Sequence, residues 1–232
     1  MKQKNVYSQN ERYFTTSEWM KILGAALVIL AVAIFFWGRG YVAYLLMCAA
    51  APVGVVLFFV AGSRRANDAD LDRFIELATE GIEVALEEDR VYAKRLDKSF
   101  APIYVGGYIY EGDVLLAKAK NGMIRSTAYE KSVLYTLTDA LYISARRISL
   151  ISDKQENTTY EIPFAELEKM EILAKDHILV CENKDYHVKE TNLLICKTDG
   201  SAISLPIKDD LVLEEFIERI LRNVKKQKAN NE

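Results

Sequence analysis

The hydrophobic residues of the chain fall into two regions with different periodicities. The first is an apolar run from Ile22 to Ala61, which is interrupted only by Gly38-Arg39-Gly40. The second begins near Tyr104, where apolar and polar residues alternate. A continuous apolar run predicts helices that are hydrophobic all round, whereas a period of two predicts half-buried strands. We therefore expect a helical hairpin followed by a strand-rich domain.

The length and the flanking residues of the apolar run favour a membrane interpretation. As helices, the segments on either side of Arg39 would reach about 24 and 31 Å, compared with about 30 Å of bilayer hydrocarbon. Trp19 and Trp37 bracket the first segment, and tryptophan favours membrane interfaces. The sequence thus predicts a cytoplasmic tail over 1–21 and a transmembrane helical hairpin over 22–61, with the cell membrane as the location.

The basic residues predict how this hairpin is oriented. They flank the apolar run on both outer sides: Lys2, Lys4, Arg12, Lys21, Arg64 and Arg65. The turn contains only Arg39, so the positive-inside rule places both termini in the cytoplasm and the turn outside. A cleaved signal peptide is the alternative, but Phe35-Phe36-Trp37 stands where its small-residue cleavage site would be.

Small residues in the second apolar segment predict close helix packing. Residues 49–54 contain three alanines, Pro52 and Gly54, and small side chains let two helices approach closely. The nearest partner is the first segment, at Gly24, Ala25 and Ala26. Packing within the hairpin is the interpretation we favour, and a neighbouring subunit is the alternative.

Residues 66–100 contain an acidic amphipathic stretch. Between 67 and 90, nine Asp and Glu residues stand against Arg73 and Arg90, which gives a net charge of −7. Apolar residues recur there with the four-three spacing of a helix packing seam: Leu71, Ile75, Ala78 and Ile82. We expect a linker helix, capped by Asn67 or Asp68, whose seam packs on its own domain or serves as an oligomer interface with a second copy.

The remainder of the chain predicts an antiparallel strand domain that ends in a helix. About seven short alternating segments follow Tyr104, and Asn121-Gly122 and Asp199-Gly200 stand between apolar runs as tight hairpin turns. The last 20 residues or so have helical periodicity. Phe216 and Ile220 lie one turn apart on its apolar stripe, and we expect them to close the domain.

Three stretches of this region resemble bacterial PH-like domains. They are Leu134 to Ser144, with its Thr-Asp turn, Tyr160 to Ile172, and Leu205-Pro-Ile with the helix from Leu211. The resemblance implies a PH-like domain over 104–228, with two orthogonal antiparallel sheets and a C-terminal capping helix. A preceding two-helix membrane anchor is common in such proteins. One departure is Ala140, because the family often has Arg or Lys directly after the Thr-Asp pair.

Charge and composition narrow the possible functions. The net charge of −3 leaves no basic surface for nucleic acid, and three cysteines do not make a disulfide framework. His177, His187, Cys181 and Cys196 are sufficient in number for zinc, but their spacing differs from the usual ligand pairs. No phosphate loop or nucleophile motif is present. We expect no enzyme activity, no metal and no cofactor.

Three basic residues surround the Asn121-Gly122 turn: Lys118, Lys120 and Arg125. They are candidates for contact with a lipid head group or a partner, although charges on a hairpin also protect a solvated sheet edge. The function we expect is a membrane-anchored, non-catalytic PH-like module for binding or assembly, on the cytoplasmic face, with a protein partner or a second copy. The alternatives are a sensor of anionic lipid head groups and a metal-binding or enzymatic module.

Overall fold

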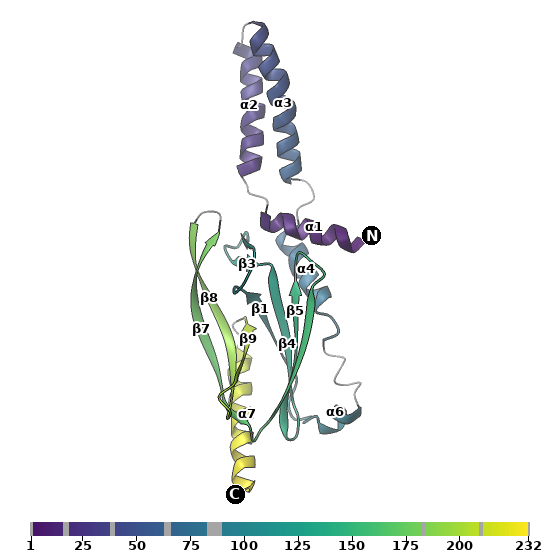
Figure 1. Cartoon of the computed structure of the whole chain (residues 1–232), viewed down its shortest axis with the longest axis vertical. Helices are drawn as coiled ribbons and strands as arrows, with labels where there is room; N and C mark the ends of the chain where they lie inside the picture. The colour runs from purple at the N-terminus through teal and green to yellow at the C-terminus, as the bar shows by residue number, and fades with distance from the viewer. Residues whose placement is uncertain are drawn as a thin grey trace. The chain divides into compact units, whose positions relative to one another are not determined.

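The chain forms two compact units in a computed structural model that describes residues 2–15, 19–37, 40–62, 66–82, 90–181, 184–208 and 211–231. The N-terminal unit comprises Met1–Leu71 and the C-terminal unit Asp72–Glu232. Figure 1 shows that the first is built from helices and that the second contains the sheets. The two units are described separately below.

The N-terminal unit contains the helices α1 (Lys2–Thr15), α2 (Trp19–Trp37) and α3 (Tyr41–Gly62), and the start of α4 (Asp68–Ala78). Asn67 caps α4 as predicted, since its Oδ1 accepts a hydrogen bond of 2.9 Å from the Asp70 amide. The Asp70 carboxylate accepts one of 3.0 Å from the Asn67 amide in return. Tyr13 of α1 donates a hydrogen bond of 2.6 Å to Asp68, which ties α1 to the first turn of α4.

Helices α2 and α3 lie side by side as a hairpin (Figure 1). Their closest approach is at Gly24 and Gly54. A Cβ atom added to Gly24 would stand 2.7 Å from the Phe58 amide nitrogen and 2.9 Å from the Gly54 carbonyl oxygen. Only glycine permits this approach, because any side chain would push the backbones apart. The predicted packing within the hairpin is thereby confirmed.

The prediction of a transmembrane anchor is wrong. Among the described residues, no helix combines the length and the apolar content that crossing a membrane requires.

This finding also overturns the predictions that followed from the anchor: the two-span contact with the membrane and the multi-pass location in the cell membrane with both termini cytoplasmic. Of the seven basic residues on which the predicted orientation depended, Arg39, Arg64 and Arg65 lie outside the described residues.

The C-terminal unit contains three antiparallel sheets among its described residues. The first has four strands in the order β1-β4-β5-β6: β1 (Ile103–Ile109), β4 (Ala128–Thr136), β5 (Ala140–Ser149) and β6 (Gln155–Pro163). The second is the short pair β2 (Leu116–Lys118) and β3 (Ile124–Ser126). The third has the order β7-β8-β9: β7 (Leu167–Cys181), β8 (Lys184–Lys197) and β9 (Ala202–Ile207). The helices are α6 (Arg90–Arg95) and α7 (Leu211–Asn231).

The sheets correct the predicted fold class in a second respect, because two sheets were expected. The additional sheet is the β2–β3 hairpin, which forms around the predicted turn at Asn121-Gly122, where Gly122 has a φ of 88°. At the end of β3, the Ser126 hydroxyl donates to the carbonyl oxygens of Ile109 and Ala128. These carbonyl groups belong to the last residue of β1 and the first residue of β4, so a side chain, and not a strand ladder, joins the hairpin to the first sheet there.

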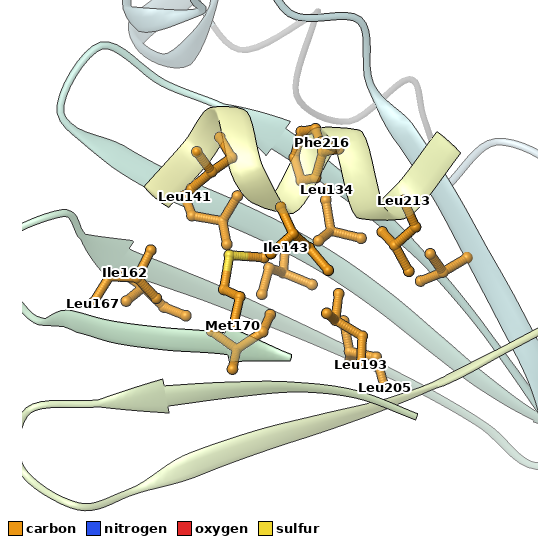
Figure 2. Packing of buried hydrophobic residues seen from close by; sticks show 14 of the residues in the cluster. Leu134, Leu141, Ile143, Ile162, Leu167, Met170, Leu193, Leu205, Leu213 and Phe216 are labelled. Carbon is orange, nitrogen blue, oxygen red and sulfur yellow. The ribbon is translucent and has the colours of Figure 1, made fainter. Parts of the chain in front are cut away.

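The core of the C-terminal unit lies between the first and third sheets, under α7. Figure 2 shows Leu213 and Phe216 pointing from α7 toward Leu134 of the first sheet and Leu193 of the third. Phe216 is 5% exposed and Ile220 is fully buried. The prediction that this helix closes the domain is therefore confirmed at both residues.

Helix α4 ends earlier than the predicted linker helix. Its last residue is Ala78, and Gly81 has a φ of 76°, a conformation that favours glycine and stops a helix. The Thr79 hydroxyl donates back to the Ile75 carbonyl at 2.7 Å, which satisfies one of the terminal acceptors. Residues 83–89 of the predicted helix lie outside the described residues.

The Thr-Asp turn before β5 is held by a residue far upstream. Ala140 is buried and carries no charge, but Arg95 of α6 pairs with the Asp139 carboxylate at 2.9 Å. The same guanidinium reaches Glu161 of β6 at 2.7 Å. In addition, the Thr138 amide donates to the Arg95 carbonyl at 2.7 Å. Bacterial PH-like domains often have Arg or Lys directly after the Thr-Asp pair, whereas in this chain the cation beside Asp139 is Arg95 of α6.

Candidate ligand-binding groove

A groove of about 940 Å³ runs along one side of the C-terminal unit. Eight elements contribute residues to its lining: α4 from Asp72 onward, β1, β3, β4, β7, β8, β9 and α7. Strands β1 and β9 lie next to each other at its base. We refer to this surface as the groove.

Two glycines of β1 make room for the groove. A Cβ atom on Gly107 would stand 3.1 Å from the Pro206 Cβ, and one on Gly106 would stand 2.9 Å from both the Glu130 carbonyl oxygen and the Tyr129 hydroxyl. Both sites are therefore too close to their neighbours for a larger residue without displacement. Because Gly106 and Gly107 have no side chains, β1 of the first sheet and β9 of the third can lie close together.

Tyrosines cover the floor beside these glycines. Tyr108 of β1 and Tyr129 of β4 are directly paired in the strand register. Their rings form an edge-to-face contact with 5.3 Å between centroids, a favoured geometry for aromatic pairs. Tyr110, which directly follows β1, donates a hydrogen bond of 2.8 Å to the Ile124 carbonyl. The floor thus offers aromatic faces with phenol groups close by.

Arg125 is the buried cation of the groove. Its side chain is only 7% exposed, and it forms a two-pronged ion pair with the Asp72 carboxylate, at 2.7 and 3.1 Å. One guanidinium nitrogen also donates to the Tyr108 oxygen at 3.0 Å. Asp72 itself is 61% exposed. The pair joins α4 to the β2–β3 hairpin, and Asp72 neutralises the buried charge.

A carboxylate–imidazole pair lies at the β8 side of the groove. Glu190 is buried and its carboxylate contacts the His177 Nε2 across the β7–β8 ladder. The Tyr110 ring lies beside the imidazole, with 6.3 Å between centroids. Glu190 is therefore held by its own partner, in the same way as Arg125 is held by Asp72.

Burial keeps the three phenols protonated. It raises the pKa of Tyr110 to about 12, with a smaller contribution from the nearby Glu190 carboxylate. Burial likewise raises the pKa of Tyr108 and of Tyr129 above the ordinary range for tyrosine. At neutral pH all three side chains therefore remain uncharged, and they can act as hydrogen-bonding groups and aromatic surfaces.

The structure does not bring the three predicted basic residues together. Lys118 is exposed, and its ammonium lies 5.1 Å from the centre of the Tyr186 ring. Arg125 is paired with Ala117 in the β2–β3 register, and successive residues of a strand point to opposite faces. Lys118 and Arg125 therefore point away from each other, and Lys120 lies exposed beyond the end of β2. Of the three, only Arg125 lines the groove.

The other residues of the groove were missed by the sequence reasoning. Asp72 was counted as one charge of an acidic helix, and its partner is 53 residues away. Tyr108 and Tyr129 were not singled out in the sequence. A signal was present in the four tyrosines at 104, 108, 110 and 129, because aromatic side chains on adjacent strands often pair. The strand register that brings them together was not available from the pattern.

The four possible zinc ligands are also separated. His177 and His187 lie on opposite faces of the β7–β8 hairpin, because His177 is paired with Val188 and His187 with Ile178. Cys181 is buried near the tip of this hairpin, and Cys196 lies toward its other end. Over the described part of the chain, no three His, Cys, Asp or Glu side chains form a group that could hold a metal ion.

The predicted oligomer seam is covered by the chain itself. Leu71 is fully buried, Ile75 is 8% exposed and Ile82 is 4% exposed, whereas Ala78 is half-buried. Within the C-terminal unit, Ile82 packs against Val133 of β4 and its neighbours. Self-association through these residues stays a prediction, and it would require the helix to leave its own chain.

Comparisons with protein-family models, with curated proteins and with solved structures found no match to this chain. The resemblance to PH-like domains consequently stays a prediction from the residues.

Proposed function

We propose that the chain is a non-catalytic binding module and that its ligand occupies the groove. The observation that carries this proposal is the state of the polar groups there. Arg125 is paired with Asp72, Glu190 with His177, and the three phenols are uncharged. Around these groups a ligand meets aromatic surface, hydroxyl groups and the backbone of Gly106 and Gly107, which are ordinary components of a small binding site. The groove is also lined by the charged side chains of Glu76, Lys131, Lys189, Lys208 and Glu214.

The same groups argue against catalysis. General acid–base catalysis needs a group that exchanges protons near neutral pH within reach of the reacting atoms. Burial raises the pKa of Tyr110 to about 12, far from neutral pH, and His177 is not among the residues that line the groove. The groups of the floor are therefore better suited to positioning a ligand than to transferring its protons.

Methyl NMR of the full-length chain tests the proposal. The probes are benzamide, benzoate and N-acetyltyrosine amide, which carry the aromatic and hydrogen-bonding groups that suit the floor. We expect saturable shifts at the methyl groups of Ile75, Ile207 and Met123, which line the groove. The methyl groups of Ile162 and Met170, which lie in the core, should not move.

A pair of variants at one exposed groove residue supplies the control. Ala174 lines the groove and is exposed, so Ala174→Trp should obstruct it without disturbing the core, whereas Ala174→Ser should not. We expect the first variant to abolish the shifts and the second to keep them. Shifts confined to residues outside the groove, or probes recovered with a changed mass, would contradict the proposal.

A further inference from the structure

We infer that Asp72 occupies a carboxylate subsite, and that the ligand of the groove carries a carboxylate which replaces Asp72 on Arg125. This inference rests on the proposed function and specifies its ligand class. The ligand is a small organic acid or the acidic group of a peptide, since both present the same planar anion.

The first argument is the geometry of the ion pair. The two terminal nitrogens of Arg125 meet the two oxygens of Asp72, at 2.7 and 3.1 Å. This fork-to-fork arrangement is the preferred way in which a guanidinium binds a carboxylate. The structure thus contains a formed carboxylate receptor, at present filled by a side chain of the chain itself.

The second argument is the unequal burial of the two partners. The Arg125 side chain is 7% exposed and that of Asp72 is 61% exposed. A carboxylate that is already largely in water loses little when it moves fully into water, whereas a buried guanidinium left without an anion is strongly disfavoured. Asp72 can therefore be exchanged only for another anion, and Arg125 selects the charge of the ligand.

The third argument is the group beside the receptor. The Tyr108 oxygen accepts a hydrogen bond from Arg125, so its own O–H remains the donor of that phenol and lies next to the position of the Asp72 carboxylate. A hydroxyl donor strengthens the binding of a carboxylate. The edge-to-face pair of Tyr108 and Tyr129 extends from this point and suits an aromatic or apolar body.

Removal of the internal carboxylate tests the inference. In Asp72→Asn the receptor loses its competing anion, so we expect benzoate to bind to the full-length chain about tenfold more tightly or better, the scale of one charge-assisted hydrogen bond. The affinity for neutral benzamide should stay the same. Glu76→Gln is the matched control, since Glu76 also lines the groove and its replacement removes the same charge.

Arg125→Lys provides a second variant that does not depend on the folding of the first. A lysine keeps the positive charge but loses the two-pronged contact, so benzoate binding should weaken by about tenfold or more, with benzamide unaffected. The tripeptides acetyl-Gly-Asp-Gly-amide and acetyl-Gly-Asn-Gly-amide show whether the carboxylate comes from a peptide or from a small organic acid. Preference for the aspartate peptide over benzoate assigns the site to acidic peptides, and the reverse assigns it to small acids.

The outcomes also separate this inference from the proposed function. If benzoate and benzamide both shift the methyl groups of the groove, but Asp72→Asn changes neither affinity, the groove binds ligands and the carboxylate subsite is refuted. If Glu76→Gln tightens benzoate as much as Asp72→Asn does, the effect is general charge and the subsite is again refuted. If no probe shifts these methyl groups, the proposed function itself fails.

Discussion

Phe216 shows how much of the stability of the C-terminal unit depends on one side chain. It lies on the buried face of α7, and its ring meets that of Phe100 edge to face, with 6.3 Å between centroids. We expect Phe216→Ala to lower the free energy of unfolding by about 3 kcal/mol or more, because it removes a buried aromatic ring and leaves a cavity. Hydrogen exchange of the β4 and β5 amides in the full-length chain measures this loss.

Glu215→Ala is the matched control for Phe216→Ala, since Glu215 is the exposed neighbour on the same helix. It should change the stability by no more than about 0.5 kcal/mol, as is usual for surface positions. A loss below about 1 kcal/mol for Phe216→Ala would show that α7 does not close the sheets.

Residues differ in how far the sequence determines their role. Phe216 and Ile220 were predictable because their helical spacing places them on one face, and a core is filled by such faces. Arg125 was identified only as a charge near a turn. Its role depends on Asp72, 53 residues away, and on the register that sets Tyr108 opposite Tyr129. Local periodicity contains no information about such pairs, so the groove could not be predicted.

On the scale of elements, α4 offers a direct comparison between its two faces. Ile75 is buried within the C-terminal unit, whereas Leu77 is 59% exposed. We expect Ile75→Asp to cost about 3 kcal/mol or more of folding free energy, because it buries an unpaired charge, and Leu77→Asp to be nearly neutral. Thermal unfolding followed by circular dichroism distinguishes the two.

The result would also bear on the oligomer seam. If Ile75→Asp left the stability unchanged while altering the mass in light scattering, Ile75 would face a second copy, and the burial seen within one chain would not describe the protein in solution.

The α2–α3 hairpin gives a second comparison. Gly24 is buried at the contact with Gly54, and Ala26 is exposed on the same helix. Gly24→Leu should force the two helices apart, because even a Cβ atom there would stand 2.7 Å from the Phe58 amide nitrogen, whereas Ala26→Leu should be tolerated. Pulsed electron paramagnetic resonance between spin labels at Cys48 and at Ile29→Cys measures the separation. An unchanged distance in Gly24→Leu would contradict this packing.

Elements were predicted with uneven success for physical reasons. The small-residue contact between α2 and α3 and the closing helix α7 follow from local composition and spacing. The membrane prediction is wrong because no helix of the described residues combines the length and the apolar content that a span requires. The predicted linker helix was too long because the apolar seam continues past Gly81, where the backbone turns to a φ of 76°. The β2–β3 sheet was missed, since strand segments of three residues give almost no periodic signal.

For the whole molecule, the buried phenols predict how stability depends on pH. Unfolded tyrosine loses its proton near pH 10, whereas folded Tyr110 does so only near pH 12. Between these values the folded state holds more protons than the unfolded state, so stability is level below about pH 10 and falls as the pH rises toward about 12. Urea unfolding of the full-length chain across this range should show the decline.

Tyr110→Phe should make this decline shallower, because it removes one of the phenols whose pKa is raised. Tyr104→Phe is the comparison, because Tyr104 of β1 is 45% exposed. It should leave the slope of stability against pH unchanged. A wild-type stability that stayed constant up to pH 12 would mean that the phenols of the groove are open to water.

The lengths of the strands in the third sheet have a consequence for motion. Strand β9 pairs with β8 only over Thr191–Cys196, so beyond Glu190 the β7–β8 hairpin continues as two strands, and Figure 1 shows it extending past β9. Its tip is tied to β2, where the Cys181 thiol donates to the Leu116 carbonyl. A two-stranded ribbon bends and opens more readily than the sheet it leaves.

Glu190 stands where this ribbon begins, while Tyr108 and Tyr129 belong to the four-stranded sheet. One wall of the groove is therefore compliant and its floor is rigid. Loop and hairpin motions of this kind take place over nanoseconds to microseconds, which is faster than most ligands dissociate. A ligand of the kind proposed above would thus meet a wall that can adjust the width of the groove, while Tyr108 and Tyr129 keep the fixed geometry of the four-stranded sheet.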